Sequence, residues 1–266
     1  MGVDILCTES KTCNYDCIYC QLGKTESPVT SRQEFVSLAK IVEDLKCFKG
    51  VAADWVTFSG MGEPTLATNL GEAISAARSI LGLPVAVFTN ASLIKDECVR
   101  QDLFKADLII AKLDATEDAL FHAINRPPEG LSIGWIVQGL QMFRFEYPGT
   151  IAMDIMLTDL NQNYIHNLSY MTKLIGAVEV HLNTPVRPSP CRPLSSNDIE
   201  AIRQNWFWDK KARTVYRDSK PEVTPVDESE AELRHPTKPN PATPGDSCGA
   251  CMATTQVCTA SDGSPA

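Results

Sequence analysis

The sequence predicts an α/β protein: an open, partial (β/α)6 barrel followed by an irregular C-terminal extension. Short runs of β-branched and aromatic residues alternate with segments of helical periodicity, which is the pattern of parallel strands joined by crossover helices. The six strand–helix units are two fewer than a closed eight-fold barrel needs. From about Asp209 the chain becomes Pro-rich and charged, which predicts an extended connector instead of a further unit.

Each element follows from a local pattern. Short apolar runs predict strands at Val3–Leu6, Trp55–Ser59, Val85–Thr89, Leu108–Leu113, Ile151–Leu157 and Val178–Asn183. Apolar residues spaced three and four apart predict helices at Arg32–Phe48, Asn69–Leu81, Asp96–Phe104, Leu131–Phe145, Gln162–Ile175 and Ser196–Trp206. We therefore divide the chain into a barrel at 1–208 and a connector with a cysteine-containing tail at 209–266.

Polar motifs follow five of the predicted strands. A cysteine loop comes after the first strand, and SGMGEP, TNA, LDA and NTPVRP come after the second, third, fourth and sixth. In parallel α/β folds the ligands bind at the carboxyl ends of the strands. The motifs are therefore expected to form one shared site.

The bulk composition narrows the class of protein. The 266 residues carry a net charge of −9, which argues against a large nucleic-acid interface because such interfaces need clustered Lys and Arg. No run approaches the ~20 apolar residues that cross a bilayer, and the N-terminus has no signal-peptide pattern. We expect a cytoplasmic protein without a membrane partner.

Ten cysteines are many for a chain in a reducing compartment, where metal binding explains them better than disulfides. Cys13, Cys17 and Cys20 form a C-x3-C-x2-C loop, and short spacings of this kind hold iron–sulfur clusters. Three thiolates on a four-iron cluster leave one iron open to a small molecule. The alternatives are a zinc site, which usually takes four ligands, and a buried trio of structural thiols.

The loop resembles the signature of the radical S-adenosylmethionine (SAM) superfamily, C-x3-C-x-aromatic-C. The surrounding GVDILCTESKTCNYDCIYCQLGKT resembles a branch of Fe–S oxidoreductases related to wybutosine-synthesis enzymes, and the likeness continues through TFSGMGEPTL, VFTNASL, AKLDA, INRPPEG and VHLNTPVRP. The resemblance covers roughly Gly2 to Trp206. It implies a partial barrel, a [4Fe–4S] cluster on Cys13, Cys17 and Cys20, and reductive cleavage of SAM to methionine and a 5′-deoxyadenosyl radical. It also places Tyr19 near the adenine.

The SGMGEP segment supplies Ser59, Gly60, Gly62 and Glu63 as candidate SAM-binding residues. Glycines let the backbone approach a ligand closely, and Glu63 can pair with an ammonium group. The segment is similar to the family's GGE element, with Met61 where a glycine is usual. It lacks the third glycine of a dinucleotide-binding fingerprint, and an ordinary β-turn is the alternative.

Thr89, Asn90, Lys112 and Asp114 end two further strands, where they could hydrogen-bond the ribose hydroxyls or the carboxylate of SAM. Local capping is the alternative, because Asn and Asp favour turns and helix starts. Asp154 falls within a strand whose residues alternate faces, so it either points into the barrel or pairs structurally. Asn183 is a candidate pocket or substrate contact.

The tail contains a second cysteine group with the spacing C-x2-C-x6-C, formed by Cys248, Cys251 and Cys258. We expect it to hold an auxiliary cluster, a second [4Fe–4S] in which Cys191 is a candidate fourth ligand. A small zinc site and free thiols are the alternatives.

The leading functional hypothesis is a radical SAM enzyme that takes an electron from ferredoxin or flavodoxin and abstracts hydrogen from a peptide or a small cofactor precursor. The wybutosine-like resemblance suggests tRNA modification as a second hypothesis. A non-catalytic, two-cluster electron carrier is a third, and the SGMGEP segment argues against it because a carrier needs no such pocket.

Overall fold

The computed structural model describes residues 1–206, 212–217 and 256–258. Its centre is one sheet of parallel strands in the order β7-β6-β5-β4-β3-β2-β1-β8. The strands are β1 Gly2–Asp4, β2 Val56–Phe58, β3 Val85–Thr89, β4 Leu108–Lys112, β5 Thr150–Met156, β6 Glu179–Asn183, β7 Ala212–Thr214 and β8 Gln256–Cys258. Since β7 and β8 are its two edges, the sheet is open, and the predicted α/β fold with an unclosed barrel is confirmed.

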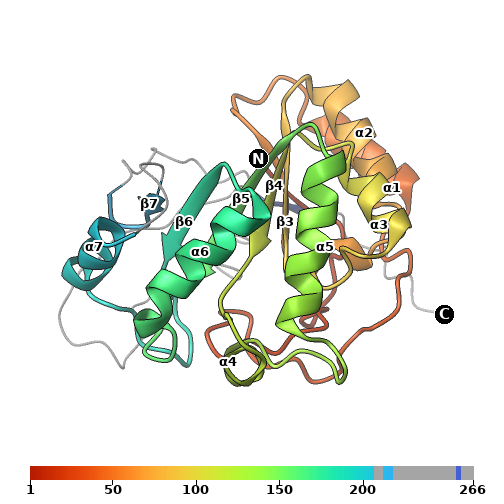
Figure 1. The fold of residues 1–266 in the computed structure, drawn as a ribbon. Coiled ribbons are helices and arrows are strands. Elements are labelled where there is room, and N and C mark those ends of the chain that lie inside the picture. The colour runs from red at the N-terminus through yellow and green to blue at the C-terminus, as the bar shows by residue number, and fades with distance from the viewer. Residues whose placement is uncertain (207–211, 218–255, 259–266) are drawn as a thin grey trace.

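Helices connect successive strands on the outer side of the sheet (Figure 1). They are α1 Leu38–Cys47, α2 Leu70–Leu81, α3 Glu97–Leu103, α5 Ile133–Glu146, α6 Ile165–Ile175 and α7 Ser196–Gln204, while the short helix α4 Asp118–Ile124 lies apart from them. Their apolar faces pack against fully buried strand residues such as Val87, Ile109 and Ile151. In the described residues no helix has both the length and the apolar character to cross a bilayer.

The first helix begins later than the sequence predicts. Residues 32–37 are not helical, because Gln33 pairs with the segment after SGMGEP: its amide donates to Leu66 O (2.9 Å) and its carbonyl accepts from Thr68 N (3.0 Å). Ser37 then caps α1 by accepting a hydrogen bond from Lys40 N. The pairing of Gln33 holds in place residues 66–68, which follow SGMGEP.

Helix α4 was not predicted, and it has a direct part in placing the cysteine loop. Leu120, Phe121 and Ile124 are buried, and the Phe121 ring contacts Tyr15 edge-on with a centroid distance of 5.6 Å. The backbone at the end of α4 also accepts hydrogen bonds from the loop, from Ile18 N to Ile124 O at 2.9 Å. Figure 1 shows α4 beside this loop, away from the helices that cover the sheet.

Candidate cluster and cofactor site

The cysteine loop follows β1 and is ordered by its own backbone. Cys20 N donates to Cys17 O and Val29 N donates to Cys13 O, both at 3.1 Å. All three thiols are free, with Cys13 buried and Cys17 and Cys20 partly buried. The loop therefore brings three soft sulfur donors to one end of the sheet.

The thiols fit an iron–sulfur cluster by their chemistry. In the described residues no three Cys, His, Asp or Glu side chains are gathered closely enough to hold a single metal ion. Burial raises the pKa of Cys13 to about 12 and that of Cys17 to about 11. These two thiols are thus protonated in the metal-free chain, and a metal centre that binds here must displace both protons.

The SGMGEP segment is bonded directly to the cysteine loop. Thr12 N donates to Met61 O at 2.7 Å, and Glu63 N donates to Thr12 O at 3.1 Å. A Cβ atom on Gly62 would lie only 1.5 Å from Thr12 O, so the close approach requires glycine at this position. The two motifs, which are some 40 residues apart in sequence, form a single junction.

Gly60 lies against β1. Its φ of 144° is in the region that favours glycine, and a Cβ there would meet the Asp4 carboxyl carbon at 2.3 Å. Asp4 is fully buried and accepts hydrogen bonds from the amides of Leu6, Cys7 and Met61. Ser59 continues the same region by donating its amide to Val3 O.

Glu63 is the centre of a buried hydrogen-bond network. Its two oxygens accept four hydrogen bonds, from Thr65 N and Oγ1, from Thr89 Oγ1 and from Asn90 N. The side chain of Asn90 continues the network to Asn14 Oδ1 (2.8 Å) and to Cys13 Sγ (3.8 Å). The predicted residues Glu63, Thr89 and Asn90 therefore come together, but the carboxylate is occupied by protein donors and only 2% of the residue is exposed.

A second network surrounds Tyr19. Its hydroxyl donates to Asp114, and Asn125 Nδ2 contacts Asp114 Oδ2 at 2.7 Å, the Tyr19 hydroxyl at 3.3 Å and Cys17 Sγ at 3.5 Å. Asp114 also accepts from Met156 N at 2.7 Å. These contacts hold the aromatic residue of the cysteine motif against the ends of β4 and β5.

Lys112 joins the Tyr19 network to the end of β6. Its ammonium lies 2.9 Å from Asp154 Oδ2 and 3.3 Å from Asp114 Oδ1, and 5.1 Å from the centre of the Tyr19 ring. Burial disfavours the charged lysine, but the two carboxylates outweigh that effect and raise the pKa of Lys112. Asn183 donates its side-chain amide to Asp154.

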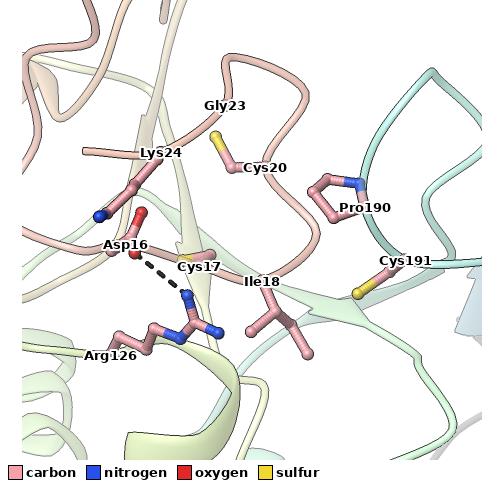
Figure 2. A pocket seen from close by; sticks show the side chains of 9 residues that line it. All are labelled: Asp16, Cys17, Ile18, Cys20, Gly23, Lys24, Arg126, Pro190 and Cys191. Carbon is pink, nitrogen blue, oxygen red and sulfur yellow. Dashed lines mark hydrogen bonds and ion pairs between the residues drawn. The ribbon is translucent and has the colours of Figure 1, made fainter. Parts of the chain in front are cut away.

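A cavity of about 280 Å³ adjoins the loop, and Figure 2 shows Cys17, Cys20 and Cys191 along its wall. Arg126 and Lys24 also line it. Arg126 pairs with Asp16 at 3.2 Å and has a backbone φ of 45°, an uncommon conformation for a residue other than glycine. Asp16 is partly buried, but the hydrogen bonds from Thr25 N and Arg126 outweigh that burial and lower the pKa of its carboxyl.

The predicted tail site lies largely outside the described residues. Cys248 and Cys251 belong to the part of the chain that the structure does not describe, and Cys258 is described only as the end of β8. Cys191, the predicted fourth ligand, lies in the cavity beside Cys17 and Cys20.

Sequence reasoning missed two asparagines near the cysteine sulfurs. Asn125 contacts Cys17 Sγ directly, and Asn14 accepts a hydrogen bond from Asn90, which contacts Cys13 Sγ. Asn14 lies within the cysteine motif and Asn125 within INRPPEG, so both were in recognised segments. The signal in the sequence was an asparagine inside each of these segments. The hydrogen-bond partners of the two side chains depend on tertiary contacts, which no spacing rule predicts.

Comparison with known proteins identifies a family and several relatives. The family model of the Radical SAM superfamily matches residues 10–157. A UPF0026 protein of Synechocystis is 38% identical over 191 residues, which are 71% of this chain and 72% of that protein. A protein of Saccharolobus islandicus named as a probable GTP 3′,8-cyclase is 23% identical over 185 residues, covering 69% of this chain and 54% of that protein.

The fold is similar to that of solved structures of Streptococcus suis SuiB. The structure with bound S-adenosylmethionine has a TM-score of 0.63 at 14% identity and covers 84% of this chain and 53% of SuiB. The structure with the precursor peptide SuiA has a TM-score of 0.63 at 15% identity and covers 82% of this chain and 48% of SuiB. This chain thus spans about half the length of SuiB and of the Saccharolobus protein.

Proposed function

Because this chain belongs to the radical SAM superfamily, we propose that it cleaves S-adenosylmethionine at the cysteine loop and uses the radical to abstract hydrogen from a peptide or a small cofactor precursor. One observation carries the proposal: the thiol loop is bonded to the SGMGEP segment on one side and, through Tyr19, to the Asp114 carboxylate after β4 on the other. Thiols and polar groups therefore face the same end of the sheet.

In this proposal Cys13, Cys17 and Cys20 ligate a [4Fe–4S] cluster. When bound, the cluster would supply the electron, received from ferredoxin or flavodoxin, that divides SAM into methionine and a 5′-deoxyadenosyl radical. Ser59, Gly60 and Gly62 bring the backbone of the SGMGEP segment against β1 and the cysteine loop, where its peptide groups could meet the SAM amino acid group.

In this proposal the remaining candidate residues hold the SGMGEP turn in place and orient the bound SAM. Glu63 fixes the SGMGEP turn by accepting hydrogen bonds from Thr89 Oγ1 and Asn90 N, and among the described residues its Oε2 accepts only the one from Asn90. The opposite wall is the network around Tyr19. Its Tyr19 hydroxyl and Lys112 ammonium are donors that could meet the ribose or the carboxylate of SAM. The other members of this wall are Asp114, Asp154 and Asn183.

Two features of the cavity bear on the substrate class. The Lys24 ammonium has no ion pair among the described residues, and Arg126 shares the cavity with one acidic neighbour, Asp16. In a chain of net charge −9, such cations favour an anionic substrate. A nucleotide-like precursor and an acidic peptide both have this chemistry, in keeping with a cyclase-named relative and a peptide-bound structural neighbour.

The primary test is replacement of one proposed ligand. Cys17→Ala is expected to abolish formation of 5′-deoxyadenosine from SAM under anaerobic, reducing conditions, because the cluster loses one of its three protein ligands. Cys47→Ala is the matched control, since Cys47 is an exposed thiol on α1. Chromatography of the nucleoside product measures both variants. Undiminished product from Cys17→Ala would contradict the proposal.

A further inference from the structure

Two buried asparagines direct their side-chain amides at two different cysteine sulfurs of the loop. Asn90 Nδ2 lies 3.8 Å from Cys13 Sγ, and Asn125 Nδ2 lies 3.5 Å from Cys17 Sγ. They come from opposite sides: Asn90 follows β3 and Asn125 follows α4. For Cys20, no side-chain donor is recorded among the described residues.

The hydrogen-bond network fixes which end of each amide faces the sulfur. Ser92 N donates to Asn90 Oδ1 at 2.9 Å, which leaves the NH₂ group of Asn90 to face Asn14 Oδ1 and Cys13. The NH₂ group of Asn125 is held by the Asp114 carboxylate, which can only accept. A flipped amide would place two oxygens together at either site.

Both donors are shielded from water. Asn90 is 9% exposed and Asn125 is 2% exposed. The amide of Asn125 is further held by the buried Asp114, and that of Asn90 by the buried Asn14. Neither amide therefore has to leave bulk water to reach the sulfur, and the N–H groups are already oriented before any metal binds.

Hydrogen bonds to ligating sulfurs are among the factors that set the potential of an iron–sulfur cluster. An added electron increases the negative charge on the sulfurs, so an N–H donor stabilises the reduced cluster more than the oxidised one. We propose that Asn90 and Asn125 raise the reduction potential of the cluster bound by this loop through N–H···S bonds to Cys13 and Cys17. The inference rests on the proposed cluster function, and it assigns these two side chains a role in electron uptake.

The test is a redox titration of the full-length reconstituted protein without SAM, followed by electron paramagnetic resonance. Asn125→Leu and Asn90→Leu each remove one N–H···S bond. Each is expected to lower the equilibrium constant for one-electron reduction about tenfold, which is 59 mV toward more negative potential. Asn69→Leu is the matched control, because Asn69 is also buried but donates to Val36 O and not to a cysteine sulfur.

A second measurement keeps the test decisive if one variant assembles poorly. Resonance Raman spectra of the variant that does assemble should show altered Fe–S(Cys) stretching bands, while those of Asn69→Leu should match the parent protein. A parent that binds no more iron than the variant with Cys13, Cys17 and Cys20 all replaced by Ala would overturn the proposed cluster function. A normal cluster with unchanged potential in both Asn90→Leu and Asn125→Leu, or an equal shift in Asn69→Leu, would overturn the present inference alone.

Discussion

At the scale of single residues, Gly62 is the position on which the junction of the two motif loops depends. Gly62→Ala would place a methyl group 1.5 Å from Thr12 O, a contact that only backbone movement can relieve. We expect the free energy of unfolding to fall by about 3 kcal/mol or more, and SAM binding to weaken because the cysteine loop shifts with Thr12. Urea denaturation and equilibrium dialysis measure the two effects.

Gly134 offers the control. A Cβ at this position, in the first turn of α5, meets nothing closer than Ser132 Oγ at 4.0 Å. Gly134→Ala should therefore be neutral or stabilise the protein by up to about 1 kcal/mol. Equal effects of the two substitutions would show that the Gly62 contact is not under steric constraint.

The polar residues at strand ends could be predicted because the carboxyl ends of parallel strands share one edge. This rule places Glu63 and Asp114, from separate parts of the sequence, at the same end of the sheet, whereas Asp154 lies within β5 and pairs with Lys112. It does not say what each carboxylate binds. Glu63 was expected to be able to pair with an ammonium group; the structure adds that its Oε1 accepts hydrogen bonds from the chain itself, a result that depends on the local turn at Thr65.

At the scale of secondary structure, strands are easier to predict than short helices. The runs that predict β3 and β4 are continuous and apolar, so their ends could be placed within one residue of those observed. Helix α4 has only seven residues, too few for two turns of clear periodicity, and it is stabilised by contacts with the cysteine loop. The start of α1 depends on the pairing of Gln33, which is likewise tertiary.

Asp107 connects three elements and gives a prediction for pH dependence. Its carboxylate accepts from Arg78 of α2 (2.9 Å) and from Val85 N at the start of β3 (2.7 Å), and it immediately precedes β4. Partial burial disfavours the charge, but these hydrogen bonds outweigh it and lower the pKa of Asp107. The resulting stabilisation is fully present above the carboxyl's unfolded-state pKa of about 3.9 and is lost as the pH falls through the lower folded-state value.

Asp107→Asn should therefore destabilise the protein near pH 7, and the loss should become smaller as the pH falls below about 3.9 toward pH 3. Because the side chain is 37% exposed, we expect a loss of at most about 1 kcal/mol at neutral pH. Thermal unfolding at the two pH values measures the difference. Glu129→Gln, in the exposed segment between α4 and α5, should change stability little at either pH. A loss from Asp107→Asn that stays constant with pH would contradict the role of its charge.

At the scale of the whole molecule, the position of Cys191 relates the proposed tail cluster to the loop cluster. Cys191 is fixed in the cavity beside Cys17 and Cys20, on the segment that leaves β6. If Cys191 is a ligand together with Cys248, Cys251 and Cys258, the second cluster must lie next to the first. Adjacent clusters would suit electron transfer between the two, whereas a tail site without Cys191 would have an open iron.

The two arrangements predict different iron contents. A variant with Cys13, Cys17 and Cys20 all replaced by Ala should retain about four irons after anaerobic reconstitution, because the tail set is untouched. Adding Cys191→Ala should reduce that content if Cys191 is a ligand, whereas adding Cys98→Ala, an exposed thiol on α3, should not. Iron and acid-labile sulfide assays measure all three variants. A triple variant without iron would mean that the tail binds no cluster of its own, and hydrogen abstraction would then have to proceed with the loop cluster alone.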